Sequence, residues 1–154
     1  MPDPIRSVLF VCLGNICRSP LAEGVMEHLA EDLELVVDSA GTGGWHVGES
    51  ADPRSIEVAE RHGITLGSRA RKVREDDFDE FDLIIAMDRS NLEDLEALRD
   101  GGSAELRLFR EFDPEAGGEM DVPDPYYGGP DGFDDVYEMV LRGCRKLLEE
   151  IERR

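Results

Sequence analysis

The stretch that begins at residue 7 reads Ser7-Val8-Leu9-Phe10-Val11-Cys12-Leu13-Gly14-Asn15-Ile16-Cys17-Arg18-Ser19. Its first five residues form a short apolar run rich in β-forming side chains, which is typical of a buried strand. From Arg18 onward the pattern changes to that of an amphipathic helix. Apolar residues recur every four positions, at Leu21, Val25, Leu29 and Leu33, and acidic residues follow another face, at Glu23, Glu27 and Glu31. The sequence therefore predicts a strand, a tight loop and a helix in that order.

The rest of the chain continues this alternation. Further strands are predicted at residues 35–37, 83–87 and 106–109, and helices at 53–62 and 90–98, with a last helix whose apolar stripe runs from Val136 to Ile151. Residues 39–44 and 113–132 are rich in glycine or proline and are predicted to be loops. Alternating strands and helices favour an α/β fold with a four-stranded parallel sheet covered on both faces, within one domain over residues 1–154. Ligands of such sheets bind beyond the carboxyl ends of the strands.

The composition is ordinary in hydrophobicity, at 40%, but the formal net charge is −19. Such a field repels nucleic acid and anionic membranes, so neither is an expected partner, and it favours a monomer. We interpret the acidity as adaptation to a salty cytoplasm. No apolar run reaches the length of a membrane span and no signal peptide opens the chain, so we expect a cytoplasmic protein. The three cysteines are too few and too irregularly spaced for a disulfide framework or a metal site.

The loop after the first strand combines a nucleophile with an anion-binding group. Cys12 and Arg18 are five residues apart, so a curled loop can bring the guanidinium beside the sulfur, where it can hold two phosphate oxygens. Backbone N–H groups and the helix N-terminus would bind the phosphate and favour the thiolate form of Cys12. A hydroxyl at Ser19 could donate to the sulfur, and Asn15 could brace the loop from within. We expect Gly14 to supply a backbone angle forbidden to most residues.

Residues 12–20 resemble the signature loop of low-molecular-weight protein tyrosine phosphatases. The resemblance continues at residues 21–23, 38–42, 45–48, 62–64, 87–91 and 122–128, in order along the chain. It implies a three-layer, flavodoxin-like α/β fold and a two-step hydrolysis of phosphotyrosine through a phosphocysteine, without a cofactor or a metal. A bacterial-type tyrosine kinase is a familiar protein substrate of this family.

The resemblance also assigns roles to individual residues. Cys12 would be the nucleophile, Arg18 would bind the phosphate, and Asp124 would protonate the leaving group and then activate water. The phosphate loop would comprise Leu13, Gly14, Asn15, Ile16, Cys17 and Ser19. Trp45, Tyr126 and Tyr127 would wall the substrate cleft, and Asp88 would support the loops around the site. In the family a histidine commonly hydrogen-bonds the loop asparagine, and Ser68 is predicted to take that place here.

Three alternatives and one regulatory role remain open. Arsenate reductases share the fold and loop but need two more cysteines near the end of the third strand, where residues 83–95 contain none. Arginine phosphatases of the superfamily carry threonine where this chain has the apolar Ile16. A phosphate-binding module without turnover would not need Asp124. Cys17 could form a reversible disulfide with Cys12, whereas Cys144, on the apolar stripe of the last helix, is predicted to serve packing.

Overall fold

The computed structural model describes residues 4–127 and 131–154, without the side chain of Tyr127. Its centre is a four-stranded sheet in which the strands are arranged in the order β2-β1-β3-β4 and every pair is parallel. The strands are β1 (Ser7–Cys12), β2 (Val36–Gly41), β3 (Leu83–Ala86) and β4 (Glu105–Leu108). The predicted parallel sheet is therefore confirmed.

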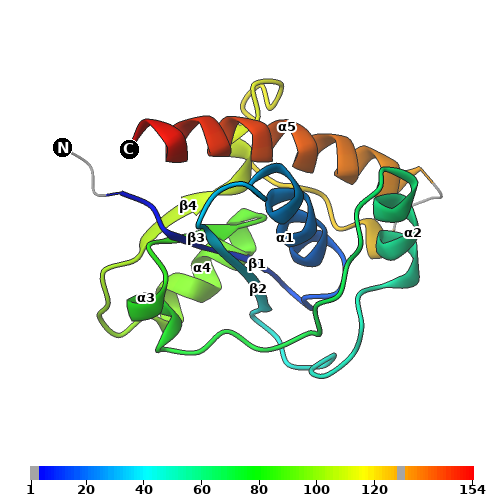
Figure 1. Ribbon diagram of the computed structural model, residues 1–154. Helices are drawn as coiled ribbons and strands as arrows, with labels where there is room; N and C mark the ends of the chain where they lie inside the picture. Colours follow the sequence, from blue (N-terminus) through cyan, green and yellow to red (C-terminus); the bar gives the residue numbers. More distant parts are fainter. Residues whose placement is uncertain (1–3, 128–130) are drawn as a thin grey trace.

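Helices cover both faces of this sheet (Figure 1). On one face lie α1 (Arg18–Leu29), α2 (Pro53–Arg61) and α5 (Gly132–Arg153). On the other lie α3 (Asp77–Glu80) and α4 (Arg89–Leu98). Two short 3₁₀ helices, η1 (Phe109–Phe112) and η2 (Pro125–Tyr127), follow β4. This is the three-layer flavodoxin-like arrangement.

The sheet separates two hydrophobic cores, because successive side chains of a strand point to opposite faces. Phe10 packs with the apolar stripe of α5, and its ring meets that of Phe109 edge to face at 6.2 Å between centroids. Leu9 and Val11 pack on the other side with Phe78. The predicted stripe of α5 is fully inside the first core, and Cys144 within it is completely buried, as expected of a packing residue.

Two predicted elements differ from the structure. The strand predicted at 35–37 extends to Gly41, because β2 pairs with β1 in register from Val36 to Gly41 and so includes half of the predicted glycine-rich loop. The helix predicted to reach Leu33 ends at Leu29. The chain turns there toward β2, with Leu33 N donating to Ala30 O, and Leu33 is 41% exposed.

The topology marks one place for a ligand site. From the central strand β1 the chain first moves outward to β2 and then returns to the other side for β3 and β4. The order of the strands reverses at β1, and its carboxyl end is Cys12. Ligands of open parallel sheets bind at such a switch point. Among the described residues, no helix is both long and apolar enough to cross a membrane.

Candidate active site

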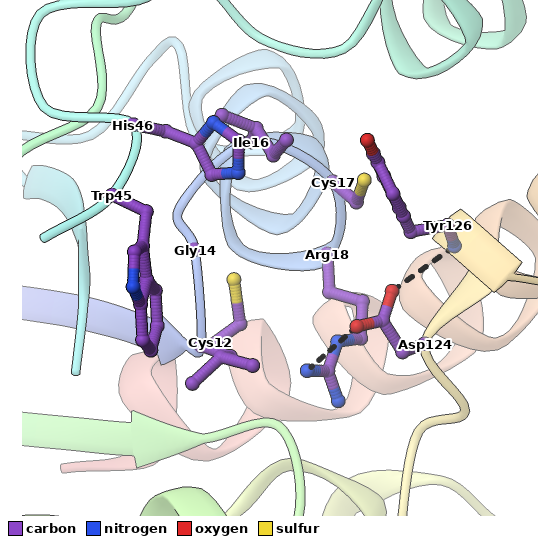
Figure 2. A pocket seen from close by; sticks show the side chains of 10 residues that line it. Cys12, Gly14, Ile16, Cys17, Arg18, Trp45, His46, Asp124 and Tyr126 are labelled. Carbon is purple, nitrogen blue, oxygen red and sulfur yellow. Dashed lines mark hydrogen bonds and ion pairs between the residues drawn. The ribbon is translucent and has the colours of Figure 1, made fainter. Parts of the chain in front are cut away.

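A cavity of about 350 Å³ opens at the carboxyl end of β1. Figure 2 shows its walls, which come from the loop after β1, the segment after β2, and η2 with the residue before it. The lining residues are Cys12, Leu13, Gly14, Ile16, Cys17, Arg18, Trp45, His46, Asp124 and Tyr126. The volume lies within the range typical of small-ligand sites. The cavity thus unites the predicted nucleophile, the predicted phosphate-binding arginine and the predicted acid, which are up to 112 positions apart in sequence.

The Cys12 sulfur is the acceptor of converging donors. Asn15 N donates to it at 3.3 Å, and Ser19 Oγ lies 2.9 Å away. Because Asn15 Nδ2 donates to Ser19 Oγ at 2.8 Å, the hydroxyl hydrogen of Ser19 is left for the sulfur. The predicted role of Ser19 as a donor therefore fits the geometry.

Arg18 is the first residue of α1 and is only 3% exposed. Its Nη1 donates to Asp88 Oδ2 at 2.6 Å and to Val122 O at 3.0 Å, while its Nη2 lies 3.8 Å from Asp124 Oδ2. Burial alone would lower the pKa of Arg18, but Cys12 and Asp88 raise it by more, so the guanidinium stays charged. Asp88 thus holds the Arg18 guanidinium in place.

Asp124 faces the same cavity from the segment before η2. Its side chain is 33% exposed, and its Oδ1 accepts a hydrogen bond from Tyr126 N at 3.0 Å. The other oxygen points toward Arg18 (Figure 2). A carboxyl group held at the mouth of a phosphate site can exchange protons with a leaving group or with water.

Aromatic side chains form the outer walls. Trp45 and Tyr126 line the cavity as predicted, and they are 72% and 41% exposed. Trp45 lies so close to Gly43 that any side chain there would overlap the indole ring. His46 also lines the cavity, although it was not predicted to do so; its position next to Trp45 was the only available signal. The prediction for the Tyr127 side chain falls outside the described part of the chain.

Two predictions about the bracing of the loop are wrong. Ser68 does not bind Asn15, whose side chain has three other partners: Nδ2 donates to Ser19 Oγ and to Ser39 Oγ at 2.9 Å, and Oδ1 accepts from Arg71 N at 3.0 Å. The left-handed backbone also belongs to Asn15, with φ of 58°, and not to Gly14. A side chain at Gly14 would instead press on the His46 ring.

The buried carboxyl group of Glu23 is hydrogen-bonded to Ser39, which also binds Asn15. Ser39 Oγ donates to Glu23 Oε1 at 2.5 Å, and Glu23 is only 8% exposed although its spacing places it on a different face from the apolar stripe of the helix. Burial raises the pKa of Glu23 to about 7, and the nearby Asp38 and Glu27 add to the shift, against the hydrogen bond from Ser39. Helical spacing alone could not find this residue, because a neighbouring strand covers that face.

Arg71 supplies the backbone N–H that donates to Asn15 Oδ1. Its guanidinium contacts Asp38 on β2 at 3.1 Å and the fully buried Asp77 of α3 at 3.0 Å. These contacts fix the chain segment whose backbone N–H binds Asn15. No sequence signal singled out Arg71.

The three cysteines are all free thiols. Cys17 is buried beside Cys12 in the loop, and burial, with Asp52 and Asp124 nearby, raises its pKa to about 12. Burial likewise raises the pKa of Cys144, whose sulfur donates to Ala22 O. Within the described part of the chain, no three His, Cys, Asp or Glu side chains form a group that could hold a metal ion.

Comparisons with known proteins identify a family and structures of the same fold. The model of a family described as low molecular weight phosphotyrosine protein phosphatase matches residues 7–154. A Streptomyces coelicolor protein named low molecular weight protein-tyrosine-phosphatase is 48% identical over 158 residues, covering 96% of this chain and 96% of the relative. The crystal structure of a protein tyrosine phosphatase from Entamoeba histolytica superimposes with a TM-score of 0.90 at 38% identity, covering 96% and 97% of the two chains. That of an arginine phosphatase from Drosophila does so with a TM-score of 0.86 at 34% identity, covering 93% and 96%.

Proposed function

This chain belongs to the low molecular weight phosphotyrosine protein phosphatase family, and from that membership we propose how its pocket hydrolyses phosphotyrosine. The Cys12 sulfur attacks the phosphorus while Arg18 and the loop amides hold the phosphoryl oxygens. The bond from phosphorus to the phenolic oxygen breaks, and Asp124 gives its proton to that oxygen. The dephosphorylated tyrosine side chain of the substrate leaves, and a phosphocysteine remains.

The second step restores the enzyme. A water molecule attacks the phosphorus of the phosphocysteine, and the Asp124 carboxylate takes a proton from that water. The bond from sulfur to phosphorus breaks, which releases phosphate and the Cys12 thiolate. The observation that carries the proposal is the meeting of Cys12, Arg18 and Asp124 in one cavity, with 3.8 Å between Arg18 Nη2 and Asp124 Oδ2.

Trapping of the intermediate tests this mechanism. A rapidly quenched reaction with a phosphotyrosine peptide should show one phosphoryl group on the peptide that contains Cys12. Asp124→Ala should lower kcat/KM by about 10²–10⁴-fold, the range typical of general acid catalysis. Asp134→Ala, which removes an exposed aspartate of α5, is the matched control and should leave kcat/KM unchanged. Absence of a phosphoryl group from Cys12 in the active enzyme would exclude the mechanism.

The shape and polarity of the cavity support an aromatic substrate over the two rivals. Ile16, Trp45 and Tyr126 offer apolar surface to a phenyl ring, whereas a phosphoguanidine would bring polar N–H groups against Ile16. Phosphoarginine should therefore be hydrolysed with a lower kcat/KM than phosphotyrosine. Arsenate reduction is disfavoured because the only cysteine outside the loop, Cys144, is 0% exposed inside α5.

Several finer statements stay predictions. They are one domain over residues 1–154, a cytoplasmic location, a monomer, a bacterial-type tyrosine kinase as protein substrate, and no affinity for nucleic acid or membranes. Reversible oxidation through a disulfide of Cys12 and Cys17 is also a proposal, supported by the place of both residues in one loop. If Cys17→Ser recovers from peroxide as fully as the unaltered protein, Cys17 has no protective role.

A further inference from the structure

We propose that Arg89 and Asp121 form a latch that positions Asp124 for proton transfer. Neither residue lines the cavity, so both would be positioning residues that act through Asp124. The inference rests on the proposed role of Asp124 as general acid.

Three hydrogen bonds join the two residues. Asp121 Oδ1 accepts from Arg89 N at 2.9 Å and from Arg89 Nε at 3.2 Å, and Asp121 Oδ2 accepts from Arg89 Nη2 at 3.1 Å. Arg89 is the first residue of α4, so the carboxylate meets both a forked guanidinium and the positive end of a helix. The Arg89 side chain and backbone hydrogen bonds lower the pKa of Asp121, which keeps it charged.

Val122, the residue after Asp121, attaches the same segment to two further parts of the fold. Val122 N donates to Met87 O at 2.8 Å, just beyond β3, and Val122 O accepts from Arg18 Nη1 at 3.0 Å. Residues 121 and 122 are thereby fixed to the sheet and to the phosphate-binding arginine. Only Pro123 separates them from Asp124, and its ring fixes one of the two backbone angles on the way. The position of Asp124 is thus set two residues upstream.

Asp124 itself has few other constraints. Its only hydrogen bond among the described residues comes from Tyr126 N, two residues downstream and in the same segment, and Arg18 is 3.8 Å away. A shift of the segment would carry both Asp124 and Tyr126 with it. The latch connects this segment to a separate element of the fold.

The alternative is an ion pair that serves only stability. Arg89 is 65% exposed and Asp121 35%, and exposed pairs contribute little to the free energy of unfolding. Position distinguishes this pair from other exposed pairs: a small displacement of a catalytic group costs rate even where it costs little stability. Its effect should therefore appear in the proton-transfer step.

The leaving group reports on that step. Phenyl phosphate releases a more basic phenolate than p-nitrophenyl phosphate and so depends more on the proton from Asp124. We expect Arg89→Ala to lower kcat/KM about 10-fold for phenyl phosphate and less than about 3-fold for p-nitrophenyl phosphate. Arg89→Lys keeps the charge and loses the forked guanidinium. Its kcat/KM for phenyl phosphate should lie between those of the unaltered protein and Arg89→Ala. Arg61→Ala, which breaks an exposed pair with Asp134 at 2.9 Å, should change neither.

A double-mutant cycle distinguishes the effect of the latch from the proposed role of Asp124 as general acid. In an Asp124→Ala background, Arg89→Ala should cause no further loss of kcat/KM. A loss that persists there, a loss that is equal for both substrates, or no loss at all in the single variant would overturn the latch. If Asp124→Ala itself shows no preference for the better leaving group, the general acid has been assigned wrongly, and the proposed function fails before the latch does.

Discussion

Asp88 Oδ2 lies 2.6 Å from Arg18 Nη1, and the other oxygen of the same carboxylate accepts from Asn91 N at 2.7 Å as the N-cap of α4. One aspartate therefore caps α4 and holds the arginine that faces the cavity. The pair is largely buried, with 3% of the Arg18 side chain and 19% of the Asp88 side chain exposed. Removal of one partner from such a pair leaves a charge without compensation.

Two substitutions of Asp88 should separate these roles. Asp88→Asn keeps an N-cap acceptor and loses the charge, while Asp88→Ala loses both, so Ala should be less stable than Asn by about 1 kcal/mol. Both should weaken inhibition by inorganic phosphate, because Arg18 is no longer held. Urea unfolding and inhibition constants measure the two effects. Equal stabilities of the two variants would contradict the capping role.

Asn15 combines a left-handed backbone with a side chain that makes three hydrogen bonds, so two substitutions should again differ. Asn15→Gly accepts φ of 58° but loses the three side-chain hydrogen bonds, and Asn15→Ala also strains the backbone. The free energy of unfolding of Asn15→Ala should be about 1 kcal/mol lower than that of Asn15→Gly, and both substitutions should lower kcat. If Ala were as stable as Gly, the left-handed conformation would not limit this position.

The sequence was most informative where local patterns act alone. The run Ser7–Val11 predicted the central strand, and the helix predicted from residue 53 begins there as α2, where Asp52 accepts from Arg54 N at 2.8 Å. The spacing of Cys12 and Arg18 located the site. Patterns failed where a distant segment decides the environment: Glu23 is buried because β2 covers its face, and Asn15 is braced by a backbone N–H, which no side-chain pattern can reveal.

Alkylation should distinguish the two cysteines of the loop. With its pKa raised to about 12, Cys17 is a thiolate in only about 10⁻⁵ of molecules at pH 7, whereas Cys12 is the proposed nucleophile of the site. Iodoacetate at pH 7 should therefore label Cys12 and inactivate the enzyme, and leave Cys17 and Cys144 unlabelled until the protein unfolds. Peptide mapping gives the sites. Labelling of Cys17 in the folded Cys12→Ser variant would contradict this expectation.

Salt should stabilise this protein. At a net charge of −19, carboxylates repel one another over much of the surface, and at 2 M salt screening confines that repulsion to a few Å. The unfolding temperature should rise by several degrees between 0.1 M and 2 M NaCl. The neutral osmolyte sucrose is a control for effects that do not involve charge. An unfolding temperature that stays constant or falls with salt would refute adaptation to a salty cytoplasm.

The buried carboxyl of Glu23 should make stability depend on pH near neutrality. Its pKa is about 7 in the folded protein and 4.5 in its ordinary state, so folding favours the protonated form. The stabilising contribution is complete below pH 4.5 and is lost as pH rises through about 7, and the difference between the two pKa values corresponds to about 3 kcal/mol. Glu23→Gln keeps an acceptor for Ser39 and cannot ionise. The free energy of unfolding of the unaltered protein should therefore fall, relative to that of Glu23→Gln, between pH 4.5 and pH 7.

Urea unfolding at constant salt over this pH range measures the difference between the two proteins. Glu57→Gln, which removes an exposed carboxylate of α2 that forms no ion pair with any residue the structure describes, controls for the change in net charge and should run parallel to the unaltered protein. Because Glu23 binds Ser39 and Ser39 binds Asn15, ionisation above pH 7 places a charge two hydrogen bonds from the phosphate loop. Curves for Glu23→Gln and the unaltered protein that stay parallel from pH 4.5 to pH 7 would mean that Glu23 titrates alike in the folded and unfolded states.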